Sequence, residues 1–299
     1  MGARIVRPLT GGMTQNTENR QSNHSDRGGM TVVVTGASGR TGSRVAEAVR
    51  GAGLTVRAAS RADGFDWEDP TTWADTLAGA DAAYLMYPSD VGSPDATEGV
   101  GALAREAVGL GVRRLVLLSA RGEEQARATE EELKSSGADW TVVQASWFAQ
   151  NFSEGPLVEG LRHGELVFPA GEVTEPFLDV RDIADVVVAA LVSGERYVGR
   201  TLELTGPRLL SFREAVAEIA GATGSELTYT PVPARAYGEA LEGFGVPTQE
   251  AAFLVEVFEG LLDGRNSRLT DGVRQVLGRE PRGFSDFVRE NAAAGVWKV

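Results

Sequence analysis

A glycine-rich turn at residues 32–42, VVVTGASGRTG, constrains the fold of this chain more than any other stretch. Gly36, Gly39 and Gly42 follow the pattern GxxGxxG between an apolar run and an amphipathic segment. Such a turn brings the backbone close to a pyrophosphate without an intervening Cβ, and it directs the N-terminus of the next helix at the anion. The spacing therefore predicts a dinucleotide-binding turn between a strand and a helix. An ordinary glycine-rich turn is the alternative.

Short apolar runs and amphipathic segments alternate from Met30 onward, which is typical of parallel strands joined by covering helices. We expect strands at residues 31–36, 54–60, 81–87, 113–119, 140–145 and 200–206, with a short one ending near 65–67. Helices are expected at residues 41–50, 71–79, 94–110, 123–136 and 181–194. The predicted fold class is α/β, with a Rossmann-type doubly wound parallel sheet.

The alternation loosens after residue 146, where aromatic, Gly and Pro residues mix. Ser211 and Glu214 form a capping box that opens a mostly helical C-terminal part, with residues 226–233 extended. We expect a nucleotide-binding domain at residues 30–146 and 178–206, and a smaller substrate or lid domain at 147–177 and 207–299. Residues 1–29 are polar and lack the apolar core of a signal peptide, which predicts a disordered leader or an over-long start before Met30.

Composition excludes several classes of function. The 299 residues contain no cysteine and two histidines, His24 and His163, so neither a disulfide framework nor a Cys or His metal centre is expected. The formal net charge is −13, and a surface of that sign repels nucleic-acid phosphates. No apolar run approaches the about 20 residues that cross a bilayer, so a cytoplasmic protein without membrane contact is predicted.

Charged residues near the glycine turn favour NADP over NAD. An NAD site commonly carries an acid after the second strand, but this chain has Ser60 and Arg61 there. Arg40, inside the turn, is expected to point toward the same region. Two guanidinium groups suit a 2′-phosphate, whereas the nearby Asp63 weighs against it. A plain surface charge is the alternative for Arg61.

Five stretches together resemble the atypical short-chain dehydrogenase/reductase family, in its NmrA-like and NAD(P)H:quinone oxidoreductase-like branch. They read VVVTGASGRTG, FDWEDPTTWADTLAGADAAYLMYP, RRLVLLSARG, LKSSGADWTVVQASWFAQNF and FLDVRDIADVVVAAL, and the resemblance extends over residues 31–292. It implies a Rossmann domain with a small C-terminal substrate domain that binds NAD(P) without flavin.

Site residues follow from this resemblance position by position. The pyrophosphate and 2′-phosphate would be lined by Gly36, Ser38, Gly39, Arg40, Thr41 and Gly42. Asp66 and Trp67 would flank the adenine, and Tyr87, Pro88 and Ser119 would line the nicotinamide ribose. Trp147, Phe148, Asn151 and Phe177 would border the substrate. The alternatives are that Trp67 and Phe148 are core aromatics, that Asp66 forms a turn and that Ser119 is a strand-end hydroxyl. The chain has Gln144 and Ala145 where the family has Arg-Pro, which puts the nearby substrate contacts in doubt.

The catalytic Tyr and Lys of typical short-chain reductases, four residues apart on one helix, are missing from residues 123–136. Ala126 stands at the expected tyrosine position and Glu130 at the lysine position, while Glu130 and Lys134 are expected to form a surface pair. A ketone would need a general acid that is not evident here. A quinone gives a stable hydroquinone anion that solvent protonates. Tyr87 or Tyr229 is a further candidate donor, although nothing in the sequence brings either to the site.

Two classes of function remain. The first is a flavin-free NADPH-dependent reductase of a quinone or polycyclic aromatic, polyketide-type compounds included. In a variant of this reading, the reduced product activates O2 and hydroxylation results. The second is an NmrA-like NADP(H) sensor that acts through a protein partner without catalysis. A homo-oligomer is compatible with either.

Overall fold

The centre of the fold is a six-stranded parallel sheet with the strand order β2-β1-β3-β4-β5-β8. The computed structural model describes residues 29–155 and 157–298, so the predicted leader lies outside the described residues except for Gly29. The order reverses between β1 and β3, which is the switch point of a doubly wound sheet. The strands are β1 (Thr31–Thr35), β2 (Thr55–Ala59), β3 (Ala82–Leu85), β4 (Arg114–Ala120), β5 (Asp139–Ala145) and β8 (Arg200–Leu204).

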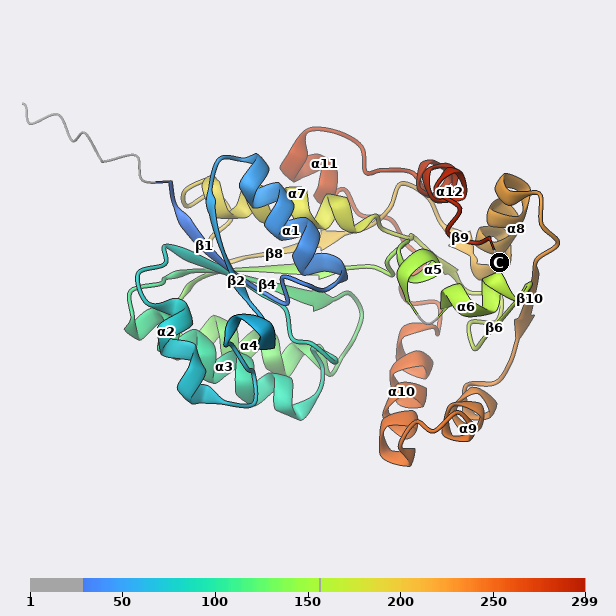
Figure 1. Cartoon of the computed structure of the whole chain (residues 1–299), viewed down its shortest axis with the longest axis horizontal. Helices are drawn as coiled ribbons and strands as arrows, with labels where there is room; N and C mark the ends of the chain where they lie inside the picture. The colour runs from blue at the N-terminus through green and yellow to red at the C-terminus, as the bar shows by residue number, and fades with distance from the viewer. Residues whose placement is uncertain (1–28, 156, 299) are drawn as a thin grey trace, which may run out of the picture.

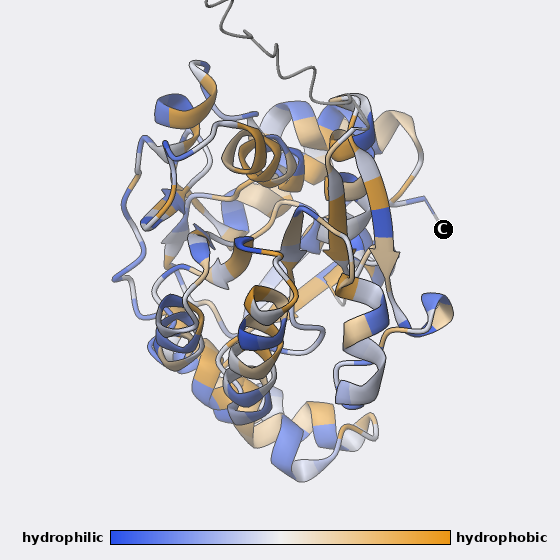
Figure 2. Ribbon diagram, turned by 90° about the vertical axis from the view of Figure 1, so that its left-hand side faces the viewer, coloured by the Kyte–Doolittle hydropathy of each residue, from blue (hydrophilic) through white to orange (hydrophobic). Residues whose placement is uncertain are grey.

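Helices cover both faces of this sheet (Figure 1). One layer contains α1 (Arg40–Gly51), α7 (Val180–Val192) and α11 (Gly272–Leu277), and the other contains α2 (Trp73–Leu77), α3 (Pro94–Gly109) and α4 (Ala126–Ser135). Successive side chains of a strand point to opposite faces, so Val32 and Val34 pack with α1 and α7 whereas Val33 packs with α3. Figure 2 shows apolar residues along the strands and mixed colouring on the helices, as amphipathic helices require. The predicted Rossmann-type fold class is confirmed.

The prediction of a short strand that ends near residues 65–67 is wrong. This stretch follows the 3-10 turn η1 (Arg61–Asp63) and runs without strand pairing into η2 (Pro70–Thr72). The backbone of Asp66 is engaged locally, because its N–H donates to Thr72 Oγ1 at 3.0 Å and its carbonyl accepts from Trp73 Nε1 at 2.7 Å. Those bonds use the groups that a sheet ladder would need.

A second lobe is built around interlocking aromatic rings. It contains α5 (Asn151–Glu154), α6 (Leu157–Arg162), α8 (Phe212–Thr223), α12 (Phe284–Ala293) and the paired parallel strands β6 (Glu165–Phe168) and β10 (Thr228–Pro231). Its core includes Phe152, Phe177, Phe212 and Phe284, all buried. The predicted capping box opens α8, with both reciprocal bonds between Ser211 and Glu214 present. Strand β6 was not expected, although its alternating burial fits a strand with one covered face.

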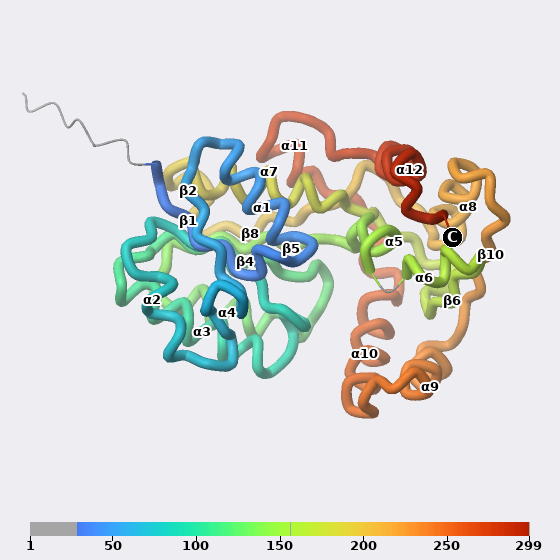
Figure 3. The backbone as a smooth tube through the Cα atoms, viewed as in Figure 1, coloured from blue at the N-terminus to red at the C-terminus, as the bar shows by residue number. Residues whose placement is uncertain are grey.

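Several connections join the second lobe to the sheet, the first of them from β5 to α5. The short strands β7 (Thr174–Glu175) and β9 (Leu210–Ser211) pair in antiparallel fashion on either side of α7 and β8. The helices α9 (Ala234–Gly243) and α10 (Thr248–Leu261) form a projecting hairpin, after which the chain returns to the sheet (Figures 1 and 3). None of the helices formed by the described residues is long and apolar enough to cross a membrane. The domain limits given above stay a prediction.

Candidate functional site

The glycine turn between β1 and α1 is closed by its own backbone. Gly36 has φ +63°, donates its N–H to Ala59 O at 3.0 Å and accepts from Gly39 N at 2.8 Å. A Cβ on Gly42 would lie 2.1 Å from Gly36 O, so the start of α1 packs directly on the turn. The side chain of Met86, just beyond β3, lies against Gly36. The three glycines thus meet the steric demands that their spacing predicts.

The N-terminus of α1 has the chemistry of a phosphate site. Gly39 caps the helix without a side-chain hydrogen bond, and the first turn contains no acidic residue. The first N–H groups of a helix have no intrahelical acceptor, and the helix dipole favours an anion there. Ser38 is exposed beside the turn, whereas Thr41 is buried. The residues present therefore fit a dinucleotide pyrophosphate, and the role of this turn stays a prediction.

Arg40 contacts the second lobe. Its Nη1 donates to Asn151 Oδ1, while Arg44, one helical turn on, donates from Nη1 to Glu154 Oε2 at 3.1 Å. This differs from the expected orientation toward Arg61, because the acceptor on α5 takes up the guanidinium. Burial lowers the pKa of Arg40, although the charge of Glu154 opposes that shift. The structure thus joins a predicted cofactor residue to a predicted substrate residue, Asn151.

The predicted 2′-phosphate residues after β2 lie at an accessible turn. Arg61 and Asp63 are exposed within η1, and Ser60 Oγ donates to Asp63 Oδ2. A phosphate here would compete with the carboxylate of Asp63 for the hydroxyl of Ser60. The side chain of Arg61 lies at the surface, where a ligand can reach it.

The predicted adenine residues belong to an aromatic group on the opposite layer from α1. Trp67 meets Phe65, Trp73 and Tyr87 with ring-centroid distances of 5.4, 6.3 and 5.2 Å. Trp67 and Tyr87 remain half-buried, so each keeps an accessible part, and Pro88 is exposed beside them. Asp66 stabilises the turn that follows it, because its Oδ1 accepts from Glu68 N at 3.1 Å.

Ser119, at the end of β4, belongs to a buried polar network centred on Glu130. Ser119 Oγ donates to Glu130 Oε1 at 2.6 Å, and Gln144 Nε2 donates to the same oxygen at 2.8 Å. The expected pair of Glu130 with Lys134 is present, with 3.5 Å between Lys134 Nζ and Glu130 Oε2. Its expected place at the surface is wrong, because Glu130 is buried. The expected helix at residues 123–136 begins only at Ala126, which places Glu130 on the inward face. Because the hydroxyl of Ser119 donates its hydrogen bond to Glu130, its oxygen can accept a hydrogen bond from a ligand.

The predicted substrate residues do not share one environment. Trp147 packs edge-on against Phe168 and Phe212, and its buried Nε1 has no hydrogen-bond partner among the described residues. Phe148 is half-buried and forms an isolated bridge with Leu178. Phe177 is 1% exposed in the aromatic core, where its ring packs against Phe152, Phe212 and Phe284. Its predicted place at the substrate border is therefore a core position in this structure.

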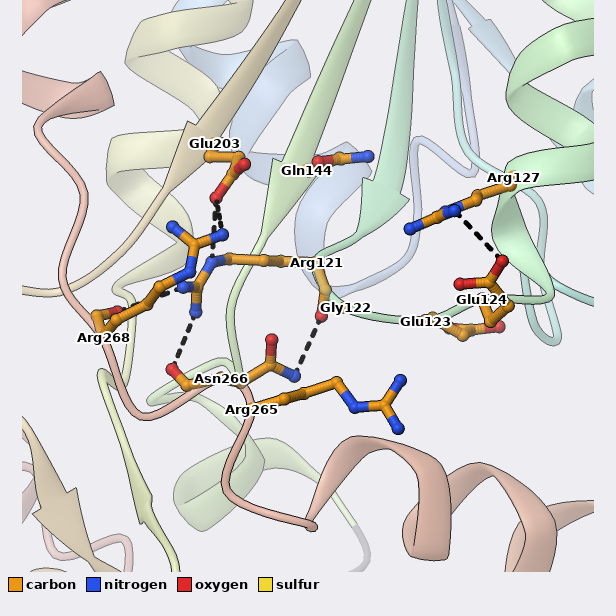
Figure 4. A pocket seen from close by; sticks show the side chains of 10 residues that line it. All are labelled: Arg121, Gly122, Glu123, Glu124, Arg127, Gln144, Glu203, Arg265, Asn266 and Arg268. Carbon is orange, nitrogen blue, oxygen red and sulfur yellow. Dashed lines mark hydrogen bonds and ion pairs between the residues drawn. The ribbon is translucent and has the colours of Figure 1, made fainter.

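A pocket of about 240 Å³ lies at the carboxyl ends of β4, β5 and β8 (Figure 4). Its lining comes from residues 121–127, from Gln144 and Glu203 on β5 and β8, and from residues 265–268 after α10. Arg121 holds these parts together, because it donates to Glu203 Oε2 at 3.2 Å and to Asn266 O at 2.9 Å. Sequence reasoning missed this pocket, apart from Gln144. The available signal was Arg121 itself, two residues after Ser119 at a strand end.

Two buried carboxyls lie near this pocket. Burial, reinforced by the hydrogen bond and charge of Asp90, raises the pKa of Glu123 to about 9. Burial also raises the pKa of Glu175 to about 7, although Arg121 opposes the shift. Neither oxygen of Glu175 has a hydrogen-bond partner within residues 29–155 and 157–298. In the same ranges, no group of three or more His, Cys, Asp or Glu residues is placed to hold a metal ion.

Known proteins resemble this chain over most of its length, although no protein-family model matches it. The oxidoreductase YesF of Bacillus subtilis, named as uncharacterized, is 30% identical over 275 residues, which cover 88% of this chain and 95% of YesF. An NADPH-dependent quinone oxidoreductase from Escherichia coli, solved with NADPH, superposes with a TM-score of 0.72 at 20% identity, covering 87% of this chain and 99% of that one. NmrA, a negative transcriptional regulator, superposes with a TM-score of 0.69 at 19% identity, covering 89% of this chain and 98% of NmrA.

Proposed function

Because this chain belongs to the atypical short-chain dehydrogenase/reductase family, in its NmrA-like and NAD(P)H:quinone oxidoreductase-like branch, we propose that it is a flavin-free NADPH-dependent reductase. Its acceptor is a quinone or polycyclic aromatic. The observation that carries this proposal is that the glycine turn and the pocket lie on the same carboxyl edge of one parallel sheet. Ligands of open α/β sheets bind at this edge.

The strand order supports a cofactor that runs from the turn toward the pocket. Neighbouring strands are about 4.8 Å apart, so β4 lies about 10 Å from β1 and β5 about 14 Å from it. A dinucleotide held at the turn by its pyrophosphate would pass Tyr87, after β3, and Ser119, at the end of β4. Ser119 is suited to accept from a ribose hydroxyl or a carboxamide, because its own proton is committed to Glu130.

The acceptor class follows from the groups that the chain offers for proton transfer. NADPH, when bound, supplies a hydride to an electron-poor ring. Helix α4 contains no tyrosine, and Tyr229 is engaged in the second lobe, where its OH donates to Gly171 O at 3.1 Å. A quinone needs no strong acid, since its two-electron reduction gives a stabilised hydroquinone anion. This favours quinones over simple ketones.

The test is NADPH oxidation followed at the nicotinamide absorbance with a panel of quinones. We expect turnover with quinones, none with simple aliphatic ketones, and the same rate without added flavin. Running each assay with and without O2 separates simple reduction from a monooxygenase outcome, in which hydroxylated product and O2 uptake accompany NADPH loss. An absence of turnover with every acceptor, together with tight NADPH binding, contradicts the reductase proposal.

The double variant Arg40→Ala/Arg61→Ala tests the preference for NADP. We expect its NADPH affinity to fall by about tenfold or more, while its NADH affinity changes little, because a 2′-phosphate loses its charge-assisted hydrogen bonds. The measurement is titration of both cofactors by calorimetry. Asn151→Ala is the control, since it removes the contact of Arg40 with α5 but keeps both guanidiniums. Unchanged NADPH affinity in the double variant removes the 2′-phosphate role.

A non-catalytic NADP(H) sensor is the second candidate. The likeness to NmrA and the absence of a tyrosine from α4 favour it. A sensor would bind the cofactor, leave quinones unreduced and change its affinity for a protein partner with the redox state of the cofactor. The quinone panel therefore discriminates between the two candidates.

A further inference from the structure

The pocket at the sheet edge concentrates positive charge in a chain whose formal charge is −13. Arg121 and Arg127 come from the stretch after β4, and Arg265 and Arg268 come from the return segment after α10. Figure 4 shows these four side chains around the same space, with Arg127 and Arg265 on one side and the Arg121–Arg268 pair on the other. Two segments whose contacting residues, Arg121 and Asn266, are 145 positions apart thus bring guanidiniums together at the edge of the sheet.

The acids in the lining do not neutralise all four arginines. Glu203 is shared, because its Oε2 accepts from Arg121 at 3.2 Å and from Arg268 at 2.8 Å. Glu124 pairs with Arg127 at 3.1 Å, and both side chains are largely exposed. An exposed pair of this kind contributes little, so Arg127 can exchange Glu124 for a better acceptor.

Burial and the neighbouring Asp90 raise the pKa of the third lining carboxyl, Glu123, which favours its neutral form. Arg265 is bound by Asp263 through Nε at 2.7 Å and Nη2 at 2.6 Å, so its Nη1 remains available. The lining therefore presents four guanidiniums against the carboxylates of Glu124 and Glu203, while Asp90 and Asp263 lie beside it.

We propose that this pocket binds an anionic oxygen group, a carboxylate, sulfonate or phosphate, carried by the aromatic substrate. The proposal rests on the proposed reductase function and names the substrate class of the same site. Whole-ligand pockets commonly measure about 300 Å³ or more, so a space of about 240 Å³ takes one end of a substrate. Arg121 is buried and fixes the lining, whereas Arg127 and Arg265 supply planar donors to the anion.

The first experiment measures binding without reduction, using 2-naphthalenesulfonate as the probe in calorimetric titrations of the full chain with NADP⁺. We expect Arg127→Gln/Arg265→Gln to raise the Kd by about tenfold or more, because two charge-assisted contacts are lost. The control Arg105→Gln/Arg235→Gln removes the same charge from α3 and α9, at residues outside the lining. It should change the Kd less than twofold. Arg127→Lys/Arg265→Lys should restore part of the affinity.

The second experiment compares 1,4-naphthoquinone with 1,4-naphthoquinone-2-sulfonate. The chain has no cysteine, so neither quinone forms a thiol adduct with it. The intrinsic reactivities of the two quinones cancel when the ratio of their kcat/KM values is compared between variants. We expect the preference for the sulfonate to fall by about tenfold in Arg127→Gln/Arg265→Gln and to persist in Arg105→Gln/Arg235→Gln.

The outcomes separate this inference from the proposed function. Arginine-dependent binding of 2-naphthalenesulfonate without quinone turnover sustains the anion site and overturns the reductase. Turnover of both quinones with an unchanged ratio keeps the reductase and overturns the anion site. Equal Kd values in the two double variants, or no binding by the unmodified protein, also overturn it. Circular dichroism and thermal unfolding of every variant establish that the fold is intact.

Discussion

Replacing Gly42 by alanine is expected to destabilise the protein by about 3 kcal/mol and to remove most of its NADPH affinity, because the new Cβ collides with fixed backbone. That Cβ would lie 2.1 Å from Gly36 O and 2.5 Å from Gly36 C. Neither atom can rotate away, so the turn and the N-terminus of α1 must separate. The measurements are urea unfolding with a common m-value and calorimetric NADPH titration.

Gly51→Ala is the matched control on the same helix. Gly51 ends α1, is exposed and has no atom within 4 Å of an added Cβ. Alanine has the higher helix propensity, so the variant should be neutral or stabilised by less than about 1 kcal/mol. Its NADPH affinity should match that of the unmodified protein. If Gly42→Ala behaves like Gly51→Ala, the close packing of turn and helix is not what holds the cofactor site.

Replacing Glu175 by glutamine is expected to stabilise the protein at pH 8 and to change it little at pH 4.5. The pKa of Glu175 is raised by burial to about 7 in the folded state, from an ordinary value of 4.5. The folded state therefore holds this proton more tightly than the unfolded chain, and stability is lost as pH rises between those two values. The loss approaches about 3 kcal/mol above pH 7, and glutamine avoids it.

Urea unfolding of both proteins between pH 4.5 and 8 measures this difference. Glu172→Gln is the control, because Glu172 lies three residues away, is exposed and pairs with Arg213 at 2.7 Å. Its pKa is lowered by the hydrogen bond from Arg213, so its replacement should bring no gain that grows with pH. A constant gap between Glu175→Gln and the unmodified protein at all pH values contradicts the account of the buried carboxyl.

The sequence predicted those features whose cause lies within a few residues. The glycine turn, the capping box of α8 and the alternating strands are local patterns, and all three appear in the structure. The prediction of a strand near residues 65–67 was wrong for a different local reason. The side chains of Thr72 and Trp73 form hydrogen bonds with the backbone N–H and carbonyl of Asp66. An apolar pattern contains no information about such side-chain competition.

The pocket could not be predicted, because its walls come together only through distant contacts. Arg121 reaches the carbonyl of Asn266, a residue 145 positions away. Glu130 shows the same difficulty on a smaller scale. Its spacing from Lys134 suggests an exposed pair, yet Ser119 and Gln144, from two strands, draw the carboxylate inward. The predicted cofactor roles remain open to the affinity measurements described above.

The antiparallel pair β7–β9 determines how the protein can be dissected. These strands lie on either side of α7 and β8 in the chain but belong to the same connection to the second lobe. A stop codon after β6 removes a sheet strand, and one after β8 removes α8, α12 and the partner of β6. A single cut thus leaves one lobe incomplete. At the domain limits predicted above, isolating either lobe as a fragment requires three breaks and a new linker, which makes point variants of the whole chain the better tool.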